Sequence, residues 1–124
     1  MNRFLLLILM IVSSYSYAHE FTPTYPTFEP SHVEGILQTR MRLFNKRNDV
    51  EYYELDVYDN KWQPIKFGAN EKVIRVAYLQ TKIVDVYIRK EDRNKVLYIC
   101  TLSKHIAKKD TTPLVSSRIC SKVK

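Results

Sequence analysis

Three histidines are the residues of this sequence whose chemistry is easiest to name: His19, His32 and His105. If the chain is cleaved directly before His19, that residue gains a free amine beside its imidazole, and the two groups together can chelate Cu(II). His32 or His105 would then supply the second imidazole of a T-shaped site. The alternative is that processing simply leaves a histidine at the first position, while the other two lie on loops. Copper binding therefore requires the fold to bring His19 and a second histidine together.

Other catalytic and cofactor sites find little support in the composition. Two glycines are too few for a phosphate-binding loop or a dinucleotide fingerprint. The two cysteines and three histidines do not fall at the paired spacings of the four ligands that a Cys-rich zinc module needs. Ser103 and His105 are close in sequence, but no third residue is placed to orient them as a nucleophile and its base. Glu54 and Asp56 fall on one face of a strand, where charges are usually solvated. We expect no enzyme activity and no cofactor other than copper.

The first 18 residues have the pattern of a secretory signal peptide. Arg3 gives the positive start, Phe4–Val12 is apolar, and Ser16–Ala18 offers the small residues that signal peptidase needs. The apolar run is shorter than the roughly 20 residues that span a membrane as a helix; an uncleaved anchor is the alternative. Removing 18 residues from a chain of 124 leaves 106, and the formal net charge falls from +7 to +6 because only Arg3 is charged.

The mature chain reads as a series of short strands separated by polar turns. Residues 19–35 form a proline-rich arm and a first edge strand, because proline cannot donate to a β-ladder. Residues 36–124 form the remainder of one domain. The predicted strands are Leu37–Asn45, Glu51–Asp59, Val73–Tyr78, Lys82–Lys90, Val96–Ser103 and Leu114–Val123. About seven strands with little helix predict an all-β, immunoglobulin-like antiparallel β-sandwich.

The two cysteines set the register of the last two predicted strands. If Cys100 faces Cys120, the hairpin centres on residue 110, inside the turn-like segment Lys108–Pro113. An exported compartment permits disulfides, so we expect a Cys100–Cys120 bond within one sheet. The same register places Leu102 opposite Arg118 and Tyr98 opposite Lys122. Two free, buried thiols are the alternative.

Three segments resemble the N-terminal immunoglobulin-like domain of bacterial periplasmic pilus chaperones, and more loosely the major-sperm-protein fold. They are the alternating strand and polar turn Met41–Asn48, the following strand Tyr53–Asp59, and the strand after a charged turn, Arg93–Ser103. The resemblance implies a sandwich fold, a periplasmic or secreted location and a role in assembly or protein binding.

The sequence also departs from that family in ways that bear on function. The family has two domains, whereas the mature chain has room for one. The family binds a pilin carboxylate with an arginine in the first strand and a lysine near the last. Lys122 could serve as the lysine, but residues 19–35 contain neither arginine nor lysine. The last strand is also a poor donor strand, because one face carries Leu114, Ser116, Arg118 and Cys120, while Val115, Ser117, Ile119, Ser121 and Val123 suit the core.

The basic charge of the chain suggests how it meets a partner. Candidate binding residues are Arg40 and Arg42 on one strand face, and Arg118 and Lys122 in the last hairpin. An exported protein rarely meets nucleic acid, so an acidic protein or the anionic envelope surface is the expected partner, reached by electrostatic steering. The charge could instead serve only solubility.

The function that combines these observations is a non-catalytic binding or assembly module of the periplasm. It would contact a partner polypeptide by a β-strand edge or by a sheet face, with the arm, Phe21–Pro30, and the basic last hairpin as the expected surfaces. The alternatives are a structural subunit of a surface appendage or secretion apparatus, and a small copper-binding protein that uses His19.

Overall fold

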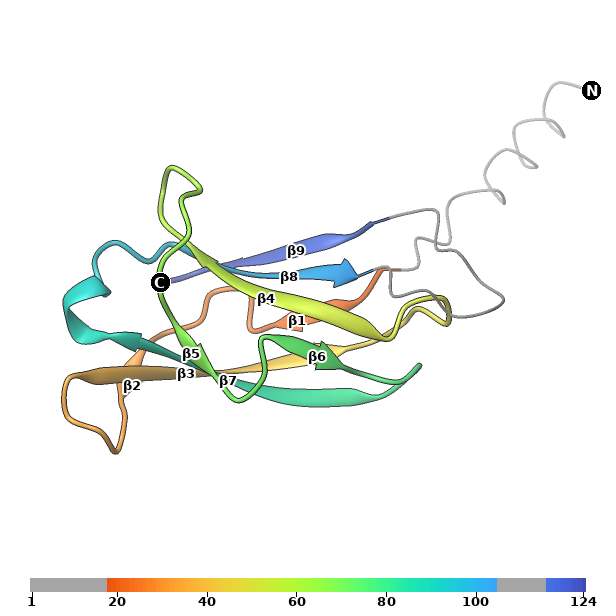
Figure 1. The fold of residues 1–124 in the computed structure, drawn as a ribbon, viewed down its shortest axis with the longest axis horizontal. Coiled ribbons are helices and arrows are strands. Elements are labelled where there is room, and N and C mark those ends of the chain that lie inside the picture. The colour runs from red at the N-terminus through yellow and green to blue at the C-terminus, as the bar shows by residue number, and fades with distance from the viewer. Residues whose placement is uncertain (1–17, 105–115) are drawn as a thin grey trace, which may run out of the picture.

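Two antiparallel β-sheets packed face to face make up the protein (Figure 1). The computed structural model describes residues 18–104 and 116–124. The first sheet contains β1 (Glu20–Thr22), β2 (Glu29–Pro30), β3 (Ile36–Phe44), β5 (Gly68–Ala69) and β7 (Thr81–Arg89). The second contains β4 (Tyr52–Tyr58), β6 (Val73–Arg75), β8 (Tyr98–Lys104) and β9 (Arg118–Lys122). The predicted β-sandwich is therefore confirmed.

The strand order explains which edges of the sandwich are exposed. The first sheet runs β1-β3-β7-β5, with β2 also pairing with β3, and the second runs β6-β4-β8-β9. The longest ladder joins β3 and β7, from Ile36–Arg89 at one end to Phe44–Thr81 at the other. Strand β9 therefore forms one edge of the second sheet. Among the described residues, no helix is long and apolar enough to cross a membrane.

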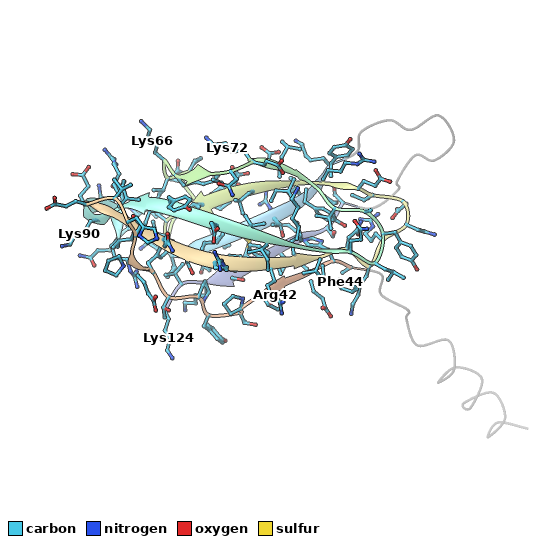
Figure 2. The ribbon with its side chains drawn as sticks, turned by 90° about the horizontal axis from the view of Figure 1, so that it is seen from below. Arg42, Phe44, Lys66, Lys72, Lys90 and Lys124 are labelled. Atoms are coloured by element: carbon cyan, nitrogen blue, oxygen red, sulfur yellow. A yellow bond between two sulfur atoms is a disulfide. The ribbon has the colours of Figure 1, made fainter. Side chains whose placement is uncertain are left out.

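The alternation seen in the sequence corresponds to the two faces of each sheet. In β3, Met41 and Leu43 are buried while Arg40 and Arg42 are exposed. In β4, Tyr53, Leu55 and Val57 point into the core. The largest fully buried side chains also include Ile74, Ile88 and Ile99. Each such side chain contributes about 1.5–3 kcal/mol on burial, whereas the charged side chains labelled in Figure 2 project outward from the sheets.

Several predicted strands are shorter in the structure. Strand β6 ends at Arg75 rather than Tyr78: the N–H of Val76 still donates across to the carbonyl of Glu51 (2.7 Å), but the carbonyl of Val76 accepts the side-chain amide of Asn45 (2.9 Å). Strand β9 begins at Arg118 rather than at Leu114, which lies outside the described residues. The charged turn after β7 forms a short 3-10 helix, η1 (Lys90–Asp92). The two-residue strand β5 has no counterpart in the predicted set.

The proline-rich arm is an integral part of the sandwich. Phe21 is buried in the core, and β1 pairs with the end of β3 from Glu20–Phe44 to Thr22–Arg42. The chain then leaves β3 after a cis Thr22–Pro23 bond and returns to it as β2, where Glu29 pairs with Gln38. The expected edge strand is therefore present in two pieces. The predicted signal segment up to residue 17 and the predicted turn at Lys108–Pro113 lie outside the described residues.

Candidate functional site

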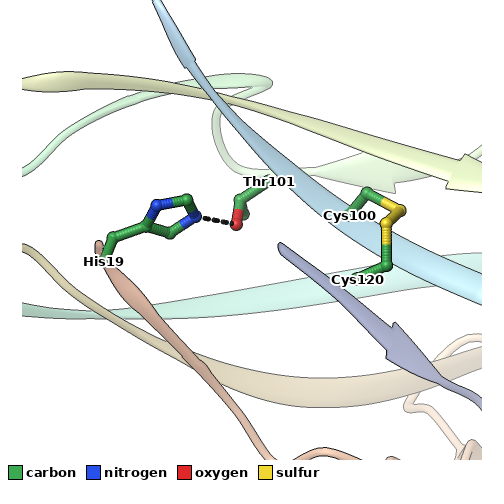
Figure 3. The surroundings of a disulfide bond; sticks show 4 residues. All are labelled: His19, Cys100, Thr101 and Cys120. Carbon is green, nitrogen blue, oxygen red and sulfur yellow. Dashed lines mark hydrogen bonds between the residues drawn. A yellow bond between two sulfur atoms is a disulfide. The ribbon is translucent and has the colours of Figure 1, made fainter. Parts of the chain in front are cut away.

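The disulfide fixes strand β9 against β8 in the predicted register. Cys100 and Cys120 are bonded (S–S 2.07 Å, Cα–Cα 4.1 Å), and the ladder also pairs Leu102 with Arg118 and Tyr98 with Lys122. A short Cα–Cα distance is typical of a non-hydrogen-bonded antiparallel pair. The backbone groups of Cys120 therefore point away from β8. Figure 3 shows the disulfide joining β8 to β9, and Thr101, the residue after Cys100, hydrogen-bonded to His19.

The outer backbone groups of β9 are hydrogen-bonded to the arm at the end of the strand and make no such bonds at its start. Ser117 and Val123 make backbone hydrogen bonds toward the β8 side, to Ser103 and Leu97, so the alternate residues face outward. The outward N–H of Lys122 donates to the carbonyl of Thr24 (3.0 Å), and that of Lys124 donates to Pro26 (2.9 Å). The arm thus runs alongside the end of β9.

At the start of the same edge β1 lies beside β9, and the backbones of the two strands are not hydrogen-bonded to each other. The outward backbone groups of Arg118 and Cys120 make no such bond to any residue within 18–104 or 116–124. The side chain of Arg118 lies over the ring of Tyr58, 5.8 Å from its centroid, and is itself exposed. This segment therefore combines strand backbone that is not hydrogen-bonded on its outer side with positive charge, and an extended, acidic peptide could bond to it by taking the place of β1.

His19, in contrast, is held inside the sandwich. It is 2% exposed, its Nε2 lies 2.7 Å from Thr101 Oγ1, and its Nδ1 lies 3.1 Å from Ser117 Oγ. Its ring also packs against Tyr53, with 4.5 Å between ring centroids. Burial, reinforced by the positive charge of Arg47, lowers the pKa of His19 to about 4, despite an opposing hydrogen bond to Thr101. The ring is therefore neutral at neutral pH.

His19 and His32, two of the histidines proposed to bind copper, lie at opposite ends of β3. His19 precedes Glu20, which pairs with the last residue of β3, whereas the exposed His32 lies just before the first residue of β3. A nine-residue strand spans about 27 Å, so the structure separates these two residues. His105 lies outside the described residues. Copper binding through His19 stays a prediction; it would require the hydrogen bond of the coordinating ring nitrogen to break, and calorimetry with Cu(II) on the processed chain and on His19→Ala tests it.

A buried polar network surrounds His19 and fixes the loops at that end of the sandwich. Asn45 Nδ2 donates to the carbonyls of Val50 (2.6 Å) and Val76 (2.9 Å). Its Oδ1 accepts from the hydroxyl of Tyr53 (2.5 Å) and the N–H of Arg47 (2.9 Å). Burial raises the pKa of Tyr53 to about 12, so its hydroxyl remains a donor. This network joins the loops at that end of the sandwich to Tyr53, whose ring packs against His19.

The four predicted basic residues fall on two opposite faces. Arg40 and Arg42 lie on the outer face of the first sheet, where Arg40 forms an ion pair with Asp85 (2.9 Å). Arg118 and Lys122 lie on the outer face of the second sheet. Only the second pair lies on an edge strand, β9, whose outer backbone groups are not all hydrogen-bonded. Thr24 and Pro26, which cover the rest of that edge, could not be identified from the sequence. The spacing of prolines in the arm indicated a position at a sheet edge, but it did not indicate which strand the arm would cover.

Comparison with known proteins bears on the fold. No family model and no curated protein matches this chain. A crystal structure of the E. coli chaperone DraB, a pilus chaperone, is similar, with a TM-score of 0.63 and 16% sequence identity. The similarity covers 86% of this chain and 53% of that chain. The chain therefore has a pilus-chaperone-like immunoglobulin-type fold. It spans about half the length of the chaperone chain that it matches.

Proposed function

We propose that this chain is an exported, non-catalytic module that binds an extended segment of a partner protein along the start of strand β9. The observation that carries the proposal is the unpaired outer backbone of Arg118 and Cys120 on a sandwich of pilus-chaperone-like fold. Strand backbone of this kind can pair with another strand that takes the place of β1 beside β9, and main-chain hydrogen bonds supply affinity without demanding a particular sequence.

The rigidity of this edge supports a binding role. The Cys100–Cys120 bond holds β9 to β8, and the arm bonds to β9 at Lys122 and Lys124, so the strand keeps its shape before a partner arrives. A binding surface that is already ordered loses less entropy on association. The positive side chains of Arg118 and Lys122 favour a partner strand that carries acidic residues on the matching face.

The course of the arm favours this proposal over a subunit of an appendage or secretion apparatus. In such a subunit the arm would pair with a neighbouring copy. Here the arm pairs with its own β3 and β9, and Phe21 fills its own core. A deletion of the arm would therefore remove core residues, so it would not separate the two functions cleanly.

A proline substitution tests the binding edge directly. Arg118→Pro removes the outward N–H of residue 118 and leaves the ladder bonds of the odd-numbered residues to β8 in place. Arg118→Ala is the matched control, because it removes the charge but keeps the N–H. A library of 12-residue peptides with alternating apolar and acidic residues supplies the ligands. We expect bound peptides to protect the amides of Arg118 and Cys120 from hydrogen exchange, and Arg118→Pro to bind them at least about tenfold more weakly than Arg118→Ala. Equal binding by both variants, or protection elsewhere, would contradict the proposal.

Export is tested separately by the location and the N-terminal residue of the mature protein. We propose a periplasmic location reached through removal of residues 1–18. Expression in a Gram-negative host, fractionation and N-terminal sequencing should give a periplasmic chain that begins at His19. Its mass should be two hydrogens below that of the reduced chain, because the disulfide is formed. A full-length chain that stays in the cytoplasm would overturn this part of the proposal and leave the binding edge to be judged on its own.

A further inference from the structure

Trp62, the single tryptophan of the chain, is held in an unusual position on the protein surface. It is 49% exposed, and its backbone adopts a φ of 60°, a left-handed conformation that non-glycine residues rarely adopt. Figure 1 shows the loop between β4 and β5, which carries this residue, projecting beyond the sheets. Backbone strain at an exposed aromatic residue needs a reason, and such strain often accompanies ligand binding.

The turn that carries Trp62 is constructed to hold it there. One carboxylate oxygen of Asp59 accepts the backbone N–H groups of Lys61 (2.8 Å) and Gln63 (2.9 Å). The backbone of Asp59 also exchanges hydrogen bonds with the turn, donating to Gln63 (3.0 Å) and accepting from Trp62 (3.1 Å). These four bonds offset the cost of the left-handed backbone and fix the direction in which the indole leaves the loop.

The indole lies flat on the outer face of the second sheet. Its ring is stacked on Tyr98, with 4.1 Å between centroids and 3° between the planes, and Tyr58 packs against it at 5.9 Å. Because one face of the indole covers Tyr98 while half of the residue stays exposed, the opposite face is turned toward solvent. The outer face of a sheet in a small sandwich is ordinarily polar. Three aromatic rings gather there, and the outer face of Trp62 is the exposed part of this platform, since Trp62 covers Tyr98 and Arg118 lies over Tyr58.

The shape and charge of the platform indicate what it can bind. A single flat ring presented to solvent matches the apolar C–H face of a pyranose, whose hydrogens meet the electron-rich face of the indole. The flanking charges are mostly positive: Lys61 adjoins Trp62, Lys122 lies opposite Tyr98, and Arg118 lies over Tyr58. Neither Lys61 nor Lys122 forms an ion pair within the described residues. The carboxylate of Asp59 accepts hydrogen bonds from the turn, and the carboxylate of Asp56 interacts with the Tyr58 hydroxyl and with the positive charge of Arg118.

We propose that Trp62 and Tyr98 form a binding site for an acidic sugar ring, such as a uronic acid unit of an envelope or extracellular polysaccharide. The pyranose stacks on the free face of Trp62, and its carboxylate lies toward Lys61 or Lys122. This site is on the face of the second sheet rather than at the edge of β9, so it goes beyond the protein-binding role and does not depend on it.

Tryptophan fluorescence gives a direct test, because the only indole in the protein is the proposed site. Titration with tri-galacturonic acid should give a saturable change in emission, and maltotriose, which is neutral, should bind about tenfold more weakly. By calorimetry, Trp62→Ala should lose at least about tenfold in affinity for tri-galacturonic acid. Tyr25→Ala is the matched control, because Tyr25 is an aromatic residue on the arm that is even more exposed than Trp62, and it should bind as the wild type does.

A charge variant and two competing peptides test the proposal independently of Trp62→Ala. Lys61→Gln alters an exposed side chain only, so it should weaken tri-galacturonic acid binding and leave maltotriose binding unchanged even if Trp62→Ala disturbs the fold. A hexaglutamate peptide and a proline-rich peptide of similar length serve as competitors. The proposal is overturned if wild type does not respond to tri-galacturonic acid, if Trp62→Ala binds it normally, if hexaglutamate binds equally well, or if only the proline-rich peptide binds.

Discussion

The two ends of the sandwich are built on different principles. At the end where β3 finishes and β9 begins, His19, Asn45, Arg47, Tyr53 and Thr101 form a buried polar network. At the other end, the interior consists of apolar side chains such as Leu37, Ile88, Val96 and Val123. The polar end is specified by directional bonds between particular atoms, whereas the apolar end depends on volume and burial. We therefore expect the two ends to respond to mutation and to pH in different ways.

The polar end also determines where the candidate binding edge lies. Asn45 joins the loops after β3 and β6, and His19 connects the start of β1 to β8 and to Ser117, just before β9. Three loops and the start of the open edge are thus tied to one network. A substitution there should therefore disturb partner binding as well as stability.

Asn45→Ala should have the largest effect on the polar end. It leaves two backbone carbonyls, the Arg47 N–H and the Tyr53 hydroxyl without their partner in a buried environment. We expect a loss of about 3–4 kcal/mol in the free energy of unfolding, measured by urea denaturation. A loss below about 1 kcal/mol would mean that the network is not what holds this end together.

Removal of the disulfide should have the next largest effect and should show whether β9 depends on the polar end. Cys100 and Cys120 are separated by 20 residues, and a crosslink closing a loop of that size contributes about 3 kcal/mol. The Cys100→Ala/Cys120→Ala double variant should lose about this amount in urea denaturation. If β9 were anchored mainly by its ladder and the network, the double variant would unfold at the wild-type urea concentration.

The pH dependence of stability should come more strongly from the polar end. The pKa of His19 is about 4 in the folded chain and 6.5 in the unfolded chain, so the unfolded state takes up a proton first as the pH falls. The stabilising effect of the neutral, buried ring is present above pH 6.5 and is lost as the pH falls from 6.5 toward 4. We expect wild type to lose about 2 kcal/mol more than His19→Gln over that window. Parallel stability curves for the two proteins would show that His19 is not buried in the neutral form.

At the apolar end a conservative truncation should have the smallest effect. Ile88→Val removes one methylene from a core residue that is 1% exposed, and should cost about 1 kcal/mol in the free energy of unfolding. The same difference is expected at pH 7 and at pH 5, because no titratable group is involved. A pH-dependent difference would indicate that the two ends are energetically coupled.

Much of the fold could be predicted from local patterns. The alternation in Leu37–Asn45 and Glu51–Asp59 identified β3 and β4 and the side chains that enter the core, because a strand turns successive side chains to opposite faces. The two cysteines predicted the whole register of β8 and β9, because a disulfide requires its two residues to face each other. The ends of β6 and β9 were less predictable, because a strand ends where its partner ends.

The candidate site was predictable only in part. Arg118 and Lys122 were identified from the sequence, but their separation from Arg40 and Arg42 on opposite faces depends on which strands share a sheet. Trp62 could not be identified as a site residue from the sequence, because a single aromatic residue beside a polar turn belongs to no periodic pattern. Its left-handed backbone and its contact with Tyr98 arise from the turn at Asp59 and from the neighbouring strand.

The sequence by itself determined the all-β class, the faces of the main strands and the pairing of the two cysteines. These properties follow from the period of a strand and the reach of one covalent bond. Only the tertiary structure decided that His19 is buried between Thr101 and Ser117, that the arm crosses to β9, and that Trp62 lies on Tyr98. Each of these contacts joins residues far apart in the chain, and such contacts depend on how the two sheets pack.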